Sequence, residues 1–216
     1  MTGLMMKDAL VMRNTLRLYA LFLLFYSGLA VLGVFPMSMA LAMVEVIVMV
    51  LPISSFSYDE AAKWDRYAAV LPVGRTAVVK ARYLFLLLVL LAAAAIGLVG
   101  SILASLLARE DLGELLATLL VSMGLGLRIA DIMLPVVYQL GPERARPWMY
   151  VIIFAPIVVL LGGAKLGLFD GIDLSWLDQL PELAVLGVFA LVPLVPLVGM
   201  LLSCWISCRI YARKEF

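Results

Sequence analysis

The sequence predicts an all-α polytopic membrane protein in which six helices cross the bilayer. Of its 216 residues, 65% are hydrophobic and 14% are charged, and the mean hydropathy is +1.13. Because a soluble domain keeps about a quarter of its residues charged, most of this chain must be surrounded by lipid. Six apolar segments match the roughly 20 residues that a helix needs to cross the hydrocarbon core. Most Lys and Arg residues lie before the first segment or after the second, fourth and sixth.

Each apolar segment must be a helix, since every backbone polar group inside lipid has to be paired within its own segment. The predicted spans are Leu18–Phe35, Met37–Phe56, Tyr83–Leu107, Leu115–Tyr138, Met149–Leu168 and Leu183–Ile206. No soluble domain interrupts them, so residues 1–216 are predicted to form a single transmembrane domain.

The distribution of Lys and Arg predicts that both termini are cytoplasmic. Thirteen of the 16 basic residues fall before span one, between spans two and three, between spans four and five, or after span six. Only Arg109 and Lys165 fall on the opposite side, and Arg128 lies within a span. Cytoplasmic loops carry the excess of Lys and Arg, so we expect an inner (plasma) membrane protein with an N-in, C-in topology.

A short amphipathic helix is predicted on the cytoplasmic side over residues 58–71. Ser57 followed three residues later by Glu60 is typical of a capping box, and Pro72 ends the pattern. The apolar residues that share one face are Trp64, Ala68 and Leu71. Two interpretations stay open: the helix lies among the lipid headgroups, or it docks into a groove on a soluble partner. A second interfacial helix is predicted on the outer side before span six, over Phe169–Glu182.

Apart from Lys165, which lies at the outer end of span five, three charged residues lie inside predicted spans: Glu45, Arg128 and Asp131. Each costs about 2.5–3.5 kcal/mol at the centre of a spanning helix. Arg128 and Asp131 are three residues apart and can pair on one face of a helix. Glu45 has no partner in its own span, so we expect it to meet Arg128 or another polar group across the bundle. The network either stabilises the bundle or takes part in the substrate path or gating.

Several kinds of chemistry are excluded by composition. The chain has no histidine, and its two cysteines, Cys204 and Cys208, are too few for a metal site. No Gly-rich phosphate-binding loop of the form G-x-x-x-x-G-K-[ST] occurs. We therefore expect no catalytic residues, no metal and no bound cofactor in this chain.

A family resemblance rests on several short motifs spread in order along the whole chain. The most specific is DEAAKWDRY at Asp59–Tyr67, in the loop after span two. The others are Gly3–Asp8, Leu71–Arg75, Val79–Tyr83, Leu134–Pro135, Leu140–Arg146 and Ser207–Phe216. Together they resemble the short six-helix permeases of the type-two ABC exporter family.

The resemblance implies a permease subunit that pairs with a second permease copy, as a homodimer or with a close relative. It also implies a cytosolic ABC ATPase as partner, which would bind ATP and Mg and hydrolyse the ATP. By this resemblance, the residues that contact the ATPase are Glu60, Trp64, Asp65 and Arg66. The transported substrate would be amphipathic or hydrophobic, such as a peptide, and the transport direction would be outward.

Two other functions stay open from the sequence. A substrate-capturing membrane subunit of an importer also has about six helices, but it needs a polar pocket that faces outward. An intramembrane enzyme is disfavoured because histidine is absent and the spans carry no clustered carboxylates beyond Glu45 and Asp131.

Overall fold

The computed structural model of the chain describes residues 2–64, 67–68, 74–168 and 181–213, and all regular secondary structure in these residues is helical. The helices are α1 (Thr2–Val11), α2 (Arg13–Val31), α3 (Met37–Ala61), α5 (Arg75–Leu107), α6 (Leu112–Leu140), α7 (Pro142–Lys165) and α9 (Glu182–Ala212). Six of them, all except α1, are long and apolar enough to cross a membrane. The predicted all-α class with six spans is therefore confirmed.

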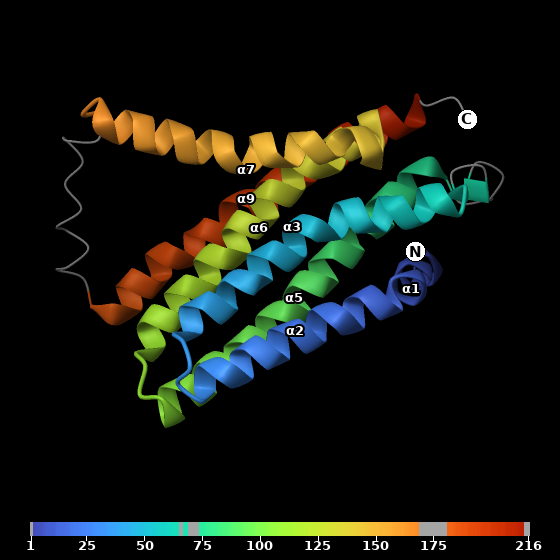
Figure 1. The fold of residues 1–216 in the computed structure, drawn as a ribbon. Helices are drawn as coiled ribbons and strands as arrows, with labels where there is room; N and C mark the ends of the chain where they lie inside the picture. Colours follow the sequence, from blue (N-terminus) through green and yellow to red (C-terminus); the bar gives the residue numbers. More distant parts are fainter. Residues whose placement is uncertain (1, 65–66, 69–73, 169–180, 214–216) are drawn as a thin grey trace.

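The central layer of the bundle consists of α3, α5 and α6 (Figure 1). Helix α2 packs on α5 and α3 at one side, and α9 and α7 pack on α6 at the other. Both termini lie at the same end of the bundle, which we call the terminal end (Figure 1). It also holds the last turn of α3, the first turn of α5 and the junction of α6 with α7. The opposite end, the far end, carries the α2–α3 and α5–α6 turns.

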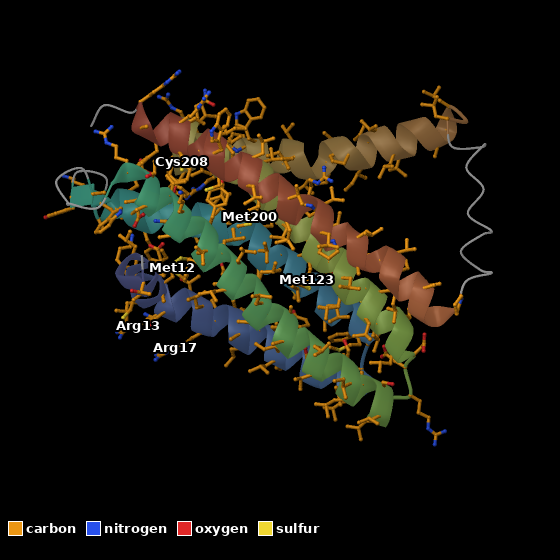
Figure 2. All side chains as sticks on the ribbon, turned by 180° about the vertical axis from the view of Figure 1, so that it is seen from behind. Met12, Arg13, Arg17, Met123, Met200 and Cys208 are labelled. Atoms are coloured by element: carbon orange, nitrogen blue, oxygen red, sulfur yellow. The ribbon has the colours of Figure 1, made fainter. Side chains whose placement is uncertain are left out.

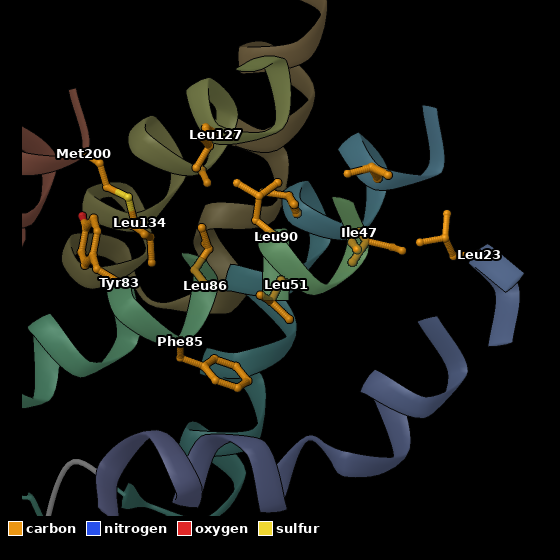
Figure 3. Packing of buried hydrophobic residues seen from close by; sticks show 14 of the residues in the cluster. Leu23, Ile47, Leu51, Tyr83, Phe85, Leu86, Leu90, Leu127, Leu134 and Met200 are labelled. Carbon is orange, nitrogen blue, oxygen red and sulfur yellow. The ribbon is translucent and has the colours of Figure 1, made fainter. Parts of the chain in front are cut away.

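The core is built from aliphatic side chains on the facing sides of these helices (Figure 3). Leu51 of α3, Leu90 of α5 and Leu127 of α6 are each 1% exposed. The outward faces remain apolar as well, as in Leu21, Leu106 and Leu201. Helices that are apolar on both faces pack against protein on the inner face and against lipid on the outer face.

The helices end where the sequence offers a turn residue. After α2, Gly33 adopts a positive φ of 74°, and Pro36 leads into α3. Asp111 caps α6 by accepting a hydrogen bond from the Glu114 amide at 3.0 Å. At the terminal end, Gly141 with φ 82° joins α6 directly to α7. Proline suits the first helical position because its missing N–H has no partner there, so Pro142 starts α7.

One predicted boundary is wrong. Ser57 does not cap a new helix, because α3 continues through Ala61 and the Ser57 hydroxyl donates to the Ile53 carbonyl at 2.9 Å. This bond to a carbonyl one turn back is typical of a serine inside a helix. The chain turns instead at Ala62–Lys63, where Lys63 adopts a φ of 50°. Trp64, Tyr67 and Ala68 are helical, and the rest of the predicted 58–71 helix lies outside the described residues.

All six spanning helices extend beyond the predicted spans at the terminal end, α5 by the most residues. Helix α5 begins at Arg75 rather than Tyr83, and its 33 residues measure about 50 Å at 1.5 Å per residue. Because the hydrocarbon core is about 30 Å thick, the first turns of α5 project out of it. The last turns of α3 project in the same way, which brings polar residues of α3 and α5 together outside the lipid.

Helix α7 leaves the bundle toward the far end (Figure 1). Its first turns are anchored by the buried Ala145, whereas every residue from 154 to 161 is exposed. The outer helix predicted over Phe169–Glu182 falls almost wholly on residues outside the described part of the chain.

Candidate functional site

The polar centre of the terminal end is a closed ring of four alternating charges, which we call the charge ring: Lys7, Asp8, Arg82 and Asp59. Lys7 Nζ lies 2.8 Å from Oδ1 of Asp8 and 2.8 Å from Oδ1 of Asp59. The second oxygens of the same two carboxylates face Arg82. Arg82 Nε lies 3.1 Å from Asp8 Oδ2, and its Nη2 contacts Asp59 Oδ2. Each carboxylate therefore bridges the two cations, and the four formal charges cancel.

Two members of the ring, Arg82 and Asp8, are buried although they are charged, whereas Lys7 and Asp59 are partly exposed, with side-chain exposures of 20% and 12%. Arg82 is 4% exposed and Asp8 is 5% exposed. The Arg82 guanidinium also donates to Ser55 and stacks over the Phe56 ring at 4.8 Å. Burying charges is costly, and a buried pair adds little net stability, but removing one partner leaves an uncompensated charge that costs about 3–5 kcal/mol. The ring therefore locks the geometry of the helices that supply it.

Three helices contribute to the ring, and local structure positions each of them. Helix α1 supplies Lys7 and Asp8, and the chain bends at the buried Met12, so that α1 lies across the terminal end. The extension of α3 past the lipid supplies Asp59, and the extension of α5 supplies Arg82. The ring thus fastens the N-terminal helix to the hairpin that α3 and α5 form.

An aromatic layer surrounds the ring. Lys7 Nζ lies 4.1 Å above the Trp64 ring. Phe56 meets Tyr138 of α6 edge to face at a centroid distance of 4.6 Å, and Tyr138 meets Tyr211 of α9 at 5.5 Å. These contacts extend from the charge ring through α3 and α6 to the last turns of α9.

The residues predicted to contact an ATPase occupy different environments. Glu60 is exposed at the end of α3, beside Asp59 of the ring. Trp64 is partly buried and packs with the buried Ala68 on the bundle's own core, so this face of the predicted helix points inward. Tyr67 is 64% exposed. Asp65 and Arg66 lie outside the described residues.

The three charges inside the spans are not brought into one cluster. Glu45 is half-buried on α3, beside Gly126 of α6: a Cβ placed on Gly126 would lie 3.4 Å from Glu45 Cα. Arg128 is exposed, and Asp131 is half-buried against α9, near Gly199. The ion pairs of the described residues do not join Glu45 to Arg128. The coupling of Glu45 and Arg128 stays a prediction.

A second polar network within the bundle has no counterpart in the sequence-based predictions. The Tyr83 hydroxyl of α5 bonds with the Ser203 hydroxyl at 2.7 Å and the Ser207 hydroxyl at 2.8 Å, both on α9. Ser203 in turn lies 2.6 Å from the Asp131 carbonyl of α6 and donates to it. Serines four residues apart on a spanning helix share one face, and this spacing is the one signal that could have located the network.

Metal chemistry finds no support in the described residues, which contain no group of three potential metal ligands. Cys204 and Cys208 are free thiols, and Cys208 donates to the Thr76 carbonyl at 4.0 Å. The Cys208 contact joins α9 to the first turn of α5.

Comparisons with known proteins agree with this architecture. The model of the family described as ABC-2 family transporter protein matches residues 3–212, which is nearly the whole chain. No curated protein and no solved structure is significantly similar to the chain. The match covers all six spans, the N-terminal helix and every member of the charge ring. This multi-pass membrane protein belongs to the ABC-2 transporter family and is a transport permease of that family.

Proposed function

We propose that the chain is the membrane subunit of an ATP-driven exporter and that a separate cytosolic ABC ATPase supplies the energy. The family assignment supports a permease role, and the sequence contains no phosphate-binding loop with which it could bind ATP by that route. Thirteen of the 16 basic residues fall in the sequence segments next to the terminal end, which is then the cytoplasmic end of an inner-membrane protein.

The single observation that carries the proposal is the charge ring. It fastens α1, α3 and α5 to one another at the end of the bundle where a cytosolic partner would bind. A force applied to the surface next to the ring is then transmitted to α3 and α5 as one rigid unit. Rigid-body rocking of helix bundles is an established way to alternate access across a membrane.

The ATPase contact surface that we propose comprises Glu60, Tyr67, Asp65 and Arg66. Glu60, next to Asp59 of the ring in the sequence, and Tyr67 are both exposed. Trp64 acts on this surface indirectly, because its ring packs beneath Lys7 and against the core. Trp64 therefore positions the contact surface rather than forming its centre.

A second permease copy would complete the transporter, as a homodimer or with a close relative. An amphipathic or hydrophobic substrate, such as a peptide, fits the apolar character of the molecule. A groove of 620 Å³ at the far end, between α5, α6 and α9, is lined by apolar side chains such as Leu98, Met123 and Leu186. An importer that captures a small polar solute would need a polar pocket instead.

The test is co-purification of the tagged chain from its host in mild detergent, with mass spectrometry of the bound proteins. We expect a stoichiometric ABC ATPase with the wild type and at least a tenfold lower yield with Glu60→Arg, because the reversed charge opposes the native contact. Glu114→Arg is the matched control, since Glu114 is also exposed but lies at the far end. A wild-type chain that purifies alone at native expression would overturn the proposal.

A further inference from the structure

An apolar trough runs along the outside of the bundle between α2 and α5. Near the terminal end it is a groove of 490 Å³, lined by residues of α1, α2, α3 and α5 such as Leu16 and Leu88. Toward the far end it continues as a groove of 470 Å³, lined by residues of α2 and α5 such as Leu24 and Val99. Ile96 lines both, so the two grooves adjoin along α2 and α5, and together we call them the trough.

Small residues keep the trough open. On the α2 side they are Ala20 and Gly28, and on the α5 side Ala92 and Ala95. A Cβ added to Gly28 would meet no atom within 4 Å, so the space beside α2 is empty. Volumes of this size are typical of sites that enclose a ligand.

Two arginines flank the trough where α2 begins. Arg13 and Arg17 are both exposed, and their side chains point away from the bundle (Figure 2). Among the described residues, no ion pair or hydrogen bond engages either guanidinium. Residues spaced by three or four share one side of a helix, so Arg13 and Arg17 continue the line of Ala20 and Leu24 that borders the trough.

We propose that this trough is a binding site for one anionic phospholipid of the leaflet at the terminal end. Its phosphate binds Arg13 and Arg17, and an acyl chain lies in the trough between α2 and α5. The length agrees: from Ala20 to Val31 the helix rises about 16 Å at 1.5 Å per residue. One leaflet contributes half of a hydrocarbon core about 30 Å thick, so an acyl chain reaches along this part of the trough.

Charge selects the class of lipid. Two unneutralised guanidinium groups at the bilayer surface favour an anionic headgroup over a zwitterionic one. The bound lipid would fill the space between α2 and the central layer, next to α1 and the charge ring. This inference stands on the trough and its arginines, and it depends neither on the ATPase nor on the direction of transport.

The test is native mass spectrometry of the full chain, purified in detergent and titrated with phosphatidylglycerol or phosphatidylcholine. We expect one phosphatidylglycerol to bind at least tenfold more tightly than phosphatidylcholine. The double variant R13Q/R17Q should weaken phosphatidylglycerol binding about tenfold or more, since each arginine adds attraction to an anionic lipid. The control is R209Q/R213Q: these arginines have the same spacing and are also exposed at the terminal end, and they lie away from the trough, in the last turn of α9 and at its C-cap. It should change the affinity less than twofold.

A second pair of variants tests the acyl chain. Gly28→Leu, whose Cβ would meet no atom within 4 Å, places a side chain in the trough and should lower phosphatidylglycerol occupancy, whereas Gly162→Leu on α7, where an added Cβ also meets nothing, should not. Equal binding of the two lipids, or equal effects of the two arginine pairs, would overturn the proposal. A Gly28→Leu variant that loses a dimer but keeps its lipid would show that a second copy occupies the trough instead.

Discussion

Arg82 of α5 and Asp8 of α1 form a buried ion pair, with the arginine Nε 3.1 Å from the aspartate Oδ2. Asp8 belongs to a ten-residue helix that does not span the membrane, whereas Arg82 lies in the longest spanning helix. Their pairing therefore makes the N-terminal helix part of the bundle. Lys7 and Asp59 complete the ring on the other side, so no single charge in it is left uncompensated.

Removal of Arg82 should destabilise the protein strongly. Arg82→Met leaves the buried Asp8 and the partly buried Asp59 facing each other across one cation, Lys7, and the expected loss is about 3–5 kcal/mol. Thermal unfolding in detergent, followed by tryptophan fluorescence, would show a markedly lower Tm than for the wild type.

The exposed pair of Arg146 and Glu143 provides the control. These side chains are 55% and 72% exposed and lie 3.4 Å apart at the same end of the bundle. Arg146→Met should therefore cost less than about 1 kcal/mol, as exposed pairs generally do. Equal shifts in Tm for the two variants would mean that the ring does not hold the helices together.

The spanning helices could be predicted from the sequence, whereas the ring could not. Six apolar runs of sufficient length specify six helices because lipid leaves the backbone no other option. From the sequence alone, Asp59 and Arg82 could equally belong to a charged loop. Nothing in the local sequence shows that α3 and α5 continue past the lipid and meet there. The Ser57 pattern was misleading for the same reason. A capping box is recognised from local sequence alone, whereas α3 continues past Ser57 to Ala61, and its last turns bring Asp59 into contact with Arg82.

Trp64 and Tyr67 should have separable roles. Trp64→Ala removes a partly buried ring from the core and from Lys7, so it should lower stability by about 2–4 kcal/mol. Tyr67→Ala removes a side chain that is 64% exposed and should leave the Tm within about 2 °C of the wild type, since surface substitutions rarely exceed 0.5 kcal/mol. If the proposed contact surface is correct, Tyr67→Ala should nevertheless lower the ATPase yield in co-purification.

Tyr150→Ala serves as the comparison for Tyr67, because Tyr150 of α7 is 58% exposed. It should affect neither the Tm nor the ATPase yield. A Tyr67 variant that retains the ATPase fully would remove this residue from the contact surface without affecting the packing role of Trp64.

The orientation in the membrane can be tested with single cysteines. In a Cys204→Ser, Cys208→Ser background, Glu60→Cys would place a thiol at the terminal end and Glu114→Cys one at the far end; both positions are exposed. With a membrane-impermeant maleimide on spheroplasts of the host, Glu114→Cys should react at once. Glu60→Cys should react only after permeabilisation, because the basic terminal end is expected to be cytoplasmic. The reverse labelling pattern would place both termini outside.

The close approach of α6 to α9 should make Gly124 intolerant of a side chain. A Cβ at this position would lie 2.8 Å from the backbone carbonyl oxygen of Val192 and 2.7 Å from its side chain. Backbone atoms cannot move aside as a flexible side chain can, so Gly124→Ala must push the two helices apart, and overpacking of this kind costs about 1–3 kcal/mol. Gly162→Ala of α7 is the matched control, since its Cβ would enter open space and alanine is the better helix former. We expect Gly124→Ala to lower the Tm and Gly162→Ala to leave it unchanged or raise it slightly.

The Tyr83–Ser203–Asp131 network links the same two helices to α5, so Gly124→Ala should also expose Ser203 and Ser207 to faster hydrogen exchange in their backbone amides. Unchanged exchange together with an unchanged Tm would mean that α9 is not held against α6 as closely as these distances indicate.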